Sequence, residues 1–446
     1  MSFRADLPRP VRLEFADDMF ARGHRGVGGA VVTQRAWRLA DSYDAGRLRE
    51  IAGRLARGRL ARRIQRALIP AARDAWSTTD DDPVLALDEH PIDDADVLGW
   101  LAERHTDPVD PHDGPGWRLA ATNLRTGGAV VSLTVAHAVA DGAAITDAVV
   151  SAATDVAPPP LPDPGTGRRR IQAEVRDAAA QIGAIGEWAR ARLRARLAGC
   201  LPTHTPAAPT PAPVPNAAAA SWTPPRVVAE FDTAAAATAA ARHGGSLNAW
   251  FVAVAASILD RIGHTAPDAP IPISVPISGF VPGDVRSNST RIARVEVDRA
   301  ALAARDLAVV RSASKEAYTR VRDAGPGLAP IPLPLVQMLP DLVLRRLPQP
   351  PQAACLASNL GALPDPFVQA MGPRVRSVAT AANYQRLTAE QARRVGGGLL
   401  AWHAAAGPRS TLTLIPAEPD RVPDAAAFAR LVVEELASWD VPTDLW

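Results

Sequence analysis

A histidine and an aspartate four residues apart form the sharpest chemical signal in the sequence. Residues 134–142 read TVAHAVADG, so His137, Asp141 and Gly142 form an H-x-x-x-D-G pattern. An unperturbed imidazole has a pKa of about 6.5, so His137 is mostly neutral near pH 7 and can accept a proton as a general base. Asp141 could pair with an arginine and stiffen the loop, while Gly142 permits a tight turn or a close backbone approach. The alternative is a strand-to-helix turn with a packed histidine and an aspartate cap.

A second polar group follows the apolar stretch from Pro350 to Leu356. The sequence there reads ASNLG and supplies Ser358, Asn359 and Gly361. Hydroxyl, amide and backbone N–H donors of this kind can hold an oxyanion or fix an acyl carbonyl. The same residues are also ordinary turn formers, so both interpretations stay open.

The first polar group lies between two predicted elements. Residues 117–124 and 129–136 are apolar-rich runs separated by RTGG, which predicts a β-hairpin. Residues 143–156 after the H-x-x-x-D-G loop are predicted to form a helix. Loops held between rigid elements often carry catalytic groups. In the second half we expect a strand at 227–231, a helix at 246–262 with Ser246 or Asn248 as its cap, and strands at 271–277, 292–297, 355–358 and 411–416.

Size and composition limit the classes of protein. With 446 residues, of which 47% are hydrophobic, and a net charge of +2, the chain is expected to form two or three folded domains. The near-balance of 49 basic and 47 acidic residues argues against a nucleic-acid binder. Cys200 and Cys355 match no metal spacing, and no disulfide framework is expected. The N-terminus lacks an apolar signal segment, and no apolar run reaches the roughly 20 residues of a membrane-spanning helix.

A proline-rich stretch divides the chain. Residues 201–225 hold eight prolines and predict an extended connector. Ahead of it, residues 168–199 carry eight arginines and a helical spacing of apolar residues, which predicts an amphipathic helix. The apolar positions are Ile171, Val175, Ala178, Ile182, Ile185 and Trp188. Such a helix either covers a core or lies on an anionic membrane surface.

Both polar groups, together with five longer segments, resemble the condensation-domain-like acyltransferases. The segments are Leu55 to Trp76, Gly114 to Leu119, Ser246 to Ile262, Pro272 to Thr290, and Ala357 to Pro364. The most similar branch is that of the wax ester synthase/diacylglycerol acyltransferases. The resemblance implies an α/β (α+β two-layer) fold, in which two chloramphenicol-acetyltransferase-like lobes form a central cleft or tunnel. It places an N-terminal lobe with the H-x-x-x-D-G loop at 1–165, the amphipathic helix and connector at 166–225, and a C-terminal lobe at 226–446.

Two positions depart from the family pattern. The family motif usually begins with paired histidines, but Ala136 stands at the first position and leaves only His137, which the family uses as the base. The family also commonly has an arginine shortly after a V-P-[IV]-S segment, whereas this chain has Gly279 and Phe280 there. Arg286 is one candidate for the missing partner of Asp141.

The resemblance implies a thioester-dependent O-acyltransferase. An acyl group would move directly from acyl-CoA or an acyl carrier protein to an alcohol or amine, with His137 as general base and Asp141 orienting the loop. Ser358, Asn359 and Gly361 would bind the substrate and help to hold the oxyanion. The absence of a G-x-S-x-G nucleophile motif agrees with direct transfer. The thioester is a co-substrate, and neither a cofactor nor a metal is implied.

Other functions stay open. One is a standalone condensation-type transferase of secondary metabolism that uses a carrier protein, and another is a non-catalytic homologue that binds acyl groups or carriers. Ala136 and the missing arginine favour the latter. A diacylglycerol or long-chain alcohol acceptor would bring the protein to a lipid surface. We therefore expect a cytoplasmic protein with peripheral contact through 168–199 at the inner face of the membrane.

Overall fold

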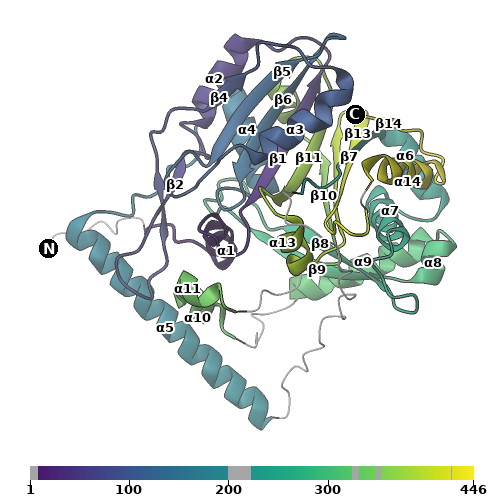
Figure 1. Ribbon diagram of the computed structural model, residues 1–446. Coiled ribbons are helices and arrows are strands. Elements are labelled where there is room, and N and C mark those ends of the chain that lie inside the picture. Colours follow the sequence, from purple (N-terminus) through teal and green to yellow (C-terminus); the bar gives the residue numbers. More distant parts are fainter. Residues whose placement is uncertain (1–8, 199–221, 324–330, 348–352, 423) are drawn as a thin grey trace.

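Two β-sheets, one in each lobe, organise the chain (Figure 1). The structure is a computed structural model that describes residues 9–198, 222–323, 331–347, 353–422 and 424–446. The first sheet has the strand order β11-β1-β6-β5-β4, with β1 (Val31–Leu39), β4 (Leu85–Leu87), β5 (Trp117–Asn123), β6 (Ala129–Ala136) and β11 (Val375–Tyr384). The antiparallel pairing of β5 with β6 confirms the predicted hairpin.

Helices cover both faces of the first sheet. One face packs against α2 (Ala45–Leu55), α4 (Gly142–Thr154), α12 (Asp365–Val368) and η2 (Gln369–Met371). The other face packs against α3 (Val97–Thr106), which follows η1 (Asp94–Asp96). Outside the sheet lie α1 (Phe15–His24) and the two-stranded ribbon of β2 (Arg62–Gln65) and β3 (Ala75–Thr78). The predicted helix after the H-x-x-x-D-G loop is therefore α4, and it packs on the sheet that carries the loop.

The second sheet has seven strands in the order β14-β7-β13-β12-β10-β8-β9. Its strands are β7 (Val227–Asp232), β8 (Ile271–Ser278), β9 (Thr290–Val297), β10 (Cys355–Ala362), β12 (Leu399–Ala406), β13 (Arg409–Pro416) and β14 (Asp444–Leu445). One face packs on α6 (Thr233–Arg242), α7 (Leu247–Arg261), α9 (Leu307–Asp323) and α14 (Ala425–Ala437). The strands predicted in this half are confirmed, as is the buried helix α7, at whose start the Ser246 hydroxyl accepts from the Ala249 N–H.

The lobes are not separate in sequence. Strand β11 comes from the second half of the chain, yet it pairs antiparallel with β1 along its whole length in the first sheet. Four further short helices are α8 (Arg299–Ala303), α10 (Leu333–Met338), α11 (Asp341–Leu344) and α13 (Ala389–Val395). The predicted chain division at 226 stays a prediction, and β11 belongs in space to the first sheet. The mixed α/β architecture, with a sheet and helices in each lobe, confirms the predicted fold class.

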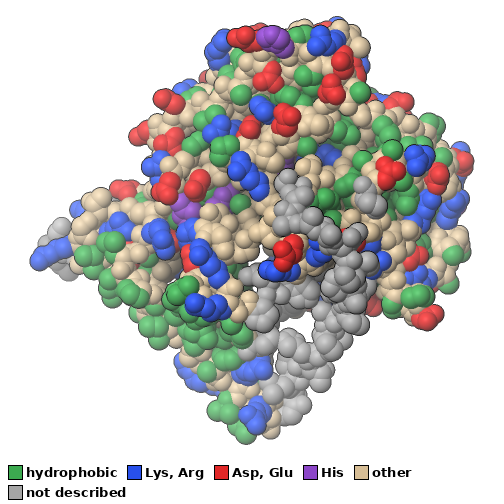
Figure 2. Space-filling view, viewed as in Figure 1, with side chains coloured by type: hydrophobic (Ala, Val, Ile, Leu, Met, Phe, Trp, Pro, Cys, Tyr) green, Lys and Arg blue, Asp and Glu red, His purple; other side chains and the backbone are tan. Residues whose placement is uncertain are grey.

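The predicted amphipathic helix forms as α5 (Gly167–Leu197), and of the two alternatives left open for its apolar stripe, covering a core holds only for Ala178, which is buried. Ile171, Val175 and Ile182 are 44%, 51% and 60% exposed. The other buried positions of the helix are polar, Glu174 and Gln181. Figure 2 shows hydrophobic side chains at the surface along this helix. The helix docks through polar contacts because the Glu174 carboxylate accepts hydrogen bonds from the backbone N–H groups of the loop before β3.

Most of the predicted proline connector at 201–225 lies outside the described residues, as does Cys200. Within the part of the chain that the structure describes, no helix is both long and apolar enough to cross a membrane.

The docking of α5 predicts a local stability effect of Glu174. Its carboxylate accepts from Leu68 N at 2.8 Å, Ile69 N at 3.0 Å and Arg170 Nε at 2.8 Å. Glu174→Ala leaves these donors without their charged acceptor, so we expect a loss of about 2 kcal/mol in the free energy that holds α5 in place. Hydrogen exchange measured across 168–198 should speed up. Glu187→Ala, which changes an exposed position of the same helix, is the control, and equal exchange in both variants would contradict this account.

Candidate active site

His137 stands at the end of β6, where the chain leaves the sheet and turns into α4. Its backbone N–H donates to the carbonyl of Val31 on β1 at 2.9 Å, so the loop begins in fixed register with the sheet. The imidazole is partly exposed and stacks on the ring of Phe20 in α1, with centroids 4.1 Å apart and planes at 23°. Two rigid elements therefore position the ring.

The amide of Asn288 fixes which ring nitrogen of His137 carries the proton. Asn288 Nδ2 donates to Asp17 Oδ1 at 2.8 Å and to the carbonyls of His137 at 3.0 Å and Ala138 at 3.4 Å. These acceptors require the NH₂ group on that side, which leaves Asn288 Oδ1 facing His137 Nδ1 at 3.1 Å. Because Oδ1 can only accept, Nδ1 is the protonated nitrogen. Nε2 then keeps its lone pair, as a general base requires.

The electrostatics also favour a neutral imidazole. Burial lowers the pKa of His137 below its ordinary value, opposed by hydrogen bonds to its own carbonyl and to Asn288 and by the charge of Asp141. Burial raises the pKa of Asp17 to about 7, opposed mainly by the amide of Asn288. His137 is thus available as a base at and below neutral pH, with a buried carboxyl group linked to it through one amide.

Asp141 holds the end of the loop. Its Oδ1 accepts from the N–H groups of Ala143 and Ala144 at 3.1 and 3.0 Å, which caps α4. Its Oδ2 accepts from Ser289 N at 2.9 Å and from the Thr290 hydroxyl at 3.1 Å, both in the other lobe. The carboxylate therefore orients the loop and ties it to the second lobe.

These contacts come from one stretch of the second lobe, residues 284–290, which we name the bridging segment. The first lobe grips its backbone with two arginines. Arg59 donates to the carbonyls of Asp284 and Arg286, the latter at 2.6 Å, and Arg62 donates to the carbonyl of Val285 at 2.8 Å. The backbone of the segment is thereby fixed up to Arg286, two residues before Asn288, which holds His137.

The suggestion that Arg286 is the partner of Asp141 is wrong. Arg286 pairs with Asp284 at 2.6 Å instead, because the two side chains lie on the same turn of the bridging segment. No described residue forms an ion pair with Asp141 within 4.0 Å. The guanidinium of Arg35 on β1 is fully buried and donates to the carbonyl of Gly142 at 2.7 Å. Burial lowers the pKa of Arg35 to about 9, with Asp141 opposing the shift, so Arg35 still carries a positive charge near Asp141 at neutral pH.

Strand β10 brings the second predicted polar group toward the loop, but its side chains point in two directions. Ser358 is in register with Trp402, whose ring packs with Ala381 of β11 between the lobes. Asn359 points the other way: its Nδ2 donates to Asn248 at 2.9 Å and its Oδ1 faces His403 Nδ1 at 2.9 Å. The side chain of Asn359 is thus committed within the second lobe.

Gly142 allows a close approach of neighbouring elements, and Gly361 allows a left-handed backbone conformation. A Cβ placed on Gly142 would lie 3.3 Å from Arg35 Nη2 and 3.6 Å from Leu360 Cδ2, so β10 and β1 both reach the start of α4. Gly361 has φ +66°, a left-handed conformation that favours glycine, and its N–H donates to Asn359 Oδ1 at 2.8 Å. The structure thereby brings Gly142 beside the strand that carries Ser358.

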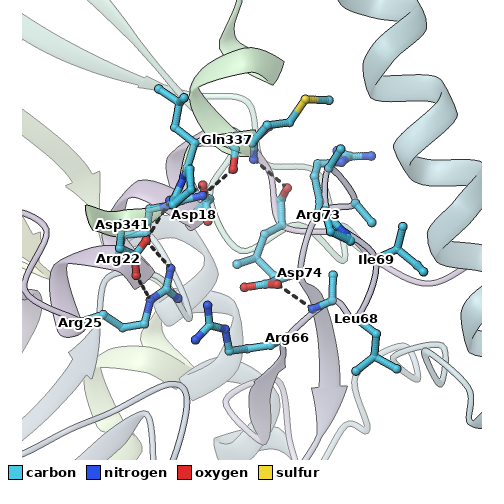
Figure 3. A pocket seen from close by; sticks show the side chains of 18 residues that line it. Asp18, Arg22, Arg25, Arg66, Leu68, Ile69, Arg73, Asp74, Gln337 and Asp341 are labelled. Carbon is cyan, nitrogen blue, oxygen red and sulfur yellow. Dashed lines mark hydrogen bonds and ion pairs between the residues drawn. The ribbon is translucent and has the colours of Figure 1, made fainter. Parts of the chain in front are cut away.

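Two cavities lie near the site without including His137. One of about 360 Å³ is polar and is lined by α1, residues 66–74 and residues 337–341; Figure 3 shows Arg22, Arg25 and Asp341 bonded at its wall. The other, of about 470 Å³, lies beside the end of β11 and is lined by apolar side chains that include Leu387 and Ile415. Tyr384 lines this second cavity and is in register with Val31, the residue that accepts from His137 N.

Comparison with solved structures identifies the architecture. The chain is similar to the wax ester synthase/diacylglycerol acyltransferase from Marinobacter aquaeolei VT8, with 13% identity, a TM-score of 0.55, and coverage of 96% of this chain and 99% of that one. It is also similar to the first condensation domain of the calcium-dependent antibiotic synthetase, with 15% identity, a TM-score of 0.57, and coverage of 97% and 96%. The condensation domain of the Monacolin K polyketide synthase MokA is similar at 13% identity, a TM-score of 0.56 and 97% coverage of both chains.

No protein-family model matches the chain, and no curated protein matches it. At these identities the likeness concerns the fold. The chain has the two-lobed condensation-type fold that these structures share, along nearly its whole length, as the sequence resemblance predicted.

Several residues at the site were not singled out from the sequence. Asn288 lies in the RSNST stretch that contributed to the resemblance, but no local pattern marks it as a neighbour of His137. Asp17 and Phe20 belong to a short helix that was not predicted. Arg35 could have been noticed because it stands in an otherwise buried strand, and a buried arginine needs polar partners inside the protein.

The geometry predicts how loss of Asn288 changes catalysis. The rate should fall on the acid side with a midpoint below pH 6.5, since the base must be unprotonated and burial lowers the pKa of His137. In Asn288→Ala the proton of the neutral His137 ring is no longer held on Nδ1, and an interaction that raises the pKa of His137 is lost. We expect kcat to fall by about 10- to 100-fold, less than for loss of the base itself, and the acid limb to move to lower pH.

The matched control is Asn123→Ala, because Asn123 accepts only a backbone N–H, from Tyr43, at 3.2 Å and stands far from the loop along the sheet. Steady-state rates of all three proteins across the pH range would provide the check. An Asn288→Ala profile that overlays the wild-type profile would contradict the assigned tautomer.

Proposed function

We propose that this protein is an acyltransferase that moves an acyl group from a thioester to an alcohol, with Nε2 of His137 as general base. The observation that carries the proposal is the hydrogen bond between His137 Nδ1 and Asn288 Oδ1, in which the orientation of Asn288 is set by acceptors on its other side. Buried His403 makes a similar bond to Asn359 Oδ1, but His137 differs in being partly exposed and in standing at the strand-to-helix loop. The solved structures of similar fold include a wax ester synthase/diacylglycerol acyltransferase, which supports this reaction class.

The proposed reaction proceeds by direct transfer. Nε2 takes the proton of the acceptor hydroxyl as its oxygen attacks the carbonyl carbon of the thioester, giving a tetrahedral oxyanion. The oxyanion then collapses, the C–S bond breaks, the ester forms, and Nε2 gives its proton to the departing sulfur, which leaves as the thiol and restores the neutral imidazole. During this cycle the transient imidazolium is stabilised by Asn288 Oδ1 and by the nearby charge of Asp141.

The oxyanion is assigned to the cleft face of β10. Ser358 lies on the same face of this strand as Leu360, which approaches Gly142, and its hydroxyl is our candidate donor. Asn359 supports the strand through its bonds to Asn248 and His403 rather than through contact with the substrate. Asp141 acts as a positioning residue.

A lipid-like substrate fits the second cavity. Its volume of about 470 Å³ lies in the range of ordinary ligand sites, and its lining is mostly apolar with Arg226 as a charged member. Tyr384 borders the cavity and lies on β11 opposite Val31 of β1, whose carbonyl accepts from His137 N. We therefore propose a long-chain acyl group or acceptor chain in this cavity, and acyl-CoA as the donor.

Substitution of His137 tests the base directly. His137→Ala should lower kcat/KM for acyl transfer by about two to four orders of magnitude, because the acceptor proton then has no positioned base. His90→Ala, at an exposed position, serves as the control. Turnover by His137→Ala close to that of the wild type would refute the assignment, and transfer assayed with purified protein and a panel of alcohols measures it.

A condensation-type transferase that uses a carrier protein is the second candidate, favoured by the similarity to condensation domains of peptide and polyketide synthases. Presenting the same acyl group on CoA and on a carrier protein, each with alcohols and amines as acceptors, discriminates between the two. We expect a higher kcat/KM for acyl-CoA with a long-chain alcohol. Transfer from the carrier only, or to amines only, would favour the second candidate.

A non-catalytic binding role has one structural point in its favour, since Phe20 stacks on the imidazole of His137. It predicts that acyl thioester binds without turnover on any acceptor, and that His137→Ala leaves this binding unchanged. Calorimetry with a non-hydrolysable acyl-CoA analogue, run beside the transfer assay, separates this outcome from catalysis.

A further inference from the structure

Helix α5 carries an apolar stripe that the described part of the chain leaves largely exposed. Its members are Ile171, Val175, Ile182 and Leu193, with exposed fractions of 44% to 60%. At 100° per residue these four side chains lie within about 40° of one another around the helix, and they extend along about 33 Å of its axis. We call this set the outer stripe.

The outer stripe is not the face by which the helix packs. Glu174, Ala178 and Gln181 are the buried residues of α5, and the Asp177 carboxylate also binds the body, accepting from Arg73 Nη2 at 2.8 Å. The helix is therefore held by polar contacts on one side. The outer stripe lies roughly 90° around the helix from Glu174 and Gln181, and its members stay 44% to 60% exposed among the residues that the structure describes (Figure 2).

The charge around the outer stripe is positive. The helix holds eight arginines and three acidic residues, and Glu174 and Asp177 are already bonded on the docked face. Arg168, Arg190 and Arg194 are among the exposed arginines. An apolar stripe flanked by arginines fits the boundary between the acyl chains and anionic headgroups of a bilayer, where long basic side chains reach outward to phosphate.

Neighbouring elements carry further exposed apolar side chains. Helix α10 touches α5, with Gln181 Nε2 3.5 Å from Gln337 Oε1. Large exposed apolar side chains on and around α10 and α11 are Leu333, Leu335, Leu342 and Leu347, and Leu68 is exposed in the loop bound by Glu174. This region is anchored to α1, since Asp341 accepts from Arg22 at 2.8 Å and from Arg25 at 2.7 Å (Figure 3).

We infer that the outer stripe of α5 docks the protein in the plane of an anionic lipid bilayer. A second copy of the chain fits less well because two such helices would bring their arginines together. An acidic carrier protein would satisfy the arginines, but it would leave uncovered much of the apolar stripe, which is about 33 Å long at a rise of about 1.5 Å per residue. The inference is independent of the proposed acyl transfer, although it would place the enzyme where lipid acceptors are.

Vesicle co-sedimentation of the purified full-length protein, without substrate, tests the inference. The wild type should bind vesicles of phosphatidylcholine with phosphatidylglycerol more tightly than vesicles of phosphatidylcholine alone. The triple variant Val175→Gln, Ile182→Gln and Leu193→Gln should bind the mixed vesicles at least about tenfold more weakly, since bilayer affinity scales with buried apolar area. Arg168→Gln, Arg190→Gln and Arg194→Gln should each weaken binding to the mixed vesicles by about fivefold.

The control carries the same change at exposed apolar positions elsewhere, namely Val156→Gln, Ile292→Gln and Val309→Gln, and should bind like the wild type. Circular dichroism of each variant verifies folding. Equal vesicle binding by the outer-stripe variant and the wild type would overturn the inference, as would equal binding to neutral and anionic vesicles. A dimer, or a complex with an acidic carrier protein, that the outer-stripe variant abolishes while vesicles go unbound would assign the surface to that partner instead.

Discussion

The contact between the bridging segment and the H-x-x-x-D-G loop is the constraint on which the site depends. Residues 284–290 belong to the second lobe, yet their backbone carbonyls accept hydrogen bonds from Arg59 and Arg62 of the first lobe. In the other direction, the amide of Asn288 contacts His137, and Ser289 and Thr290 donate to Asp141. One short stretch therefore fixes the position of the loop, the tautomer of its histidine and the spacing of the lobes at that point. Any motion that separates the lobes here would free the imidazole.

A second connection between the lobes is strand β11. Strand β11 completes the first sheet from the second half of the chain, and Ala381 on this strand packs with Trp402 of the second sheet. The two lobes are thus joined by one shared strand and by one hydrogen-bonded segment. This arrangement favours a preorganised site, in which donors and base keep their positions while substrates enter and leave.

Local patterns predicted the elements but not the contacts between them. The hairpin of β5 and β6 and the buried helix α7 follow from apolar runs of the right length. Strand β1 was missed because it is buried almost throughout and contains Gln34 and Arg35, so it lacks the alternation of an ordinary strand. Asn288 was missed because its partners lie 151 and 271 residues away. The orientation of α5 was not predicted because its docking uses Glu174 and not its apolar stripe.

The central claim is that Asn288 leaves Nε2 of His137 unprotonated. Nitrogen NMR of protein labelled in its histidine rings measures this directly, with the His137 signals assigned by their loss in His137→Gln. At neutral pH the account predicts a neutral ring with the proton on Nδ1 and a lone-pair signal from Nε2, which exchanges to the other tautomer or to a mixture in Asn288→Ala. A His137 ring protonated on Nε2, or charged at neutral pH, would contradict it.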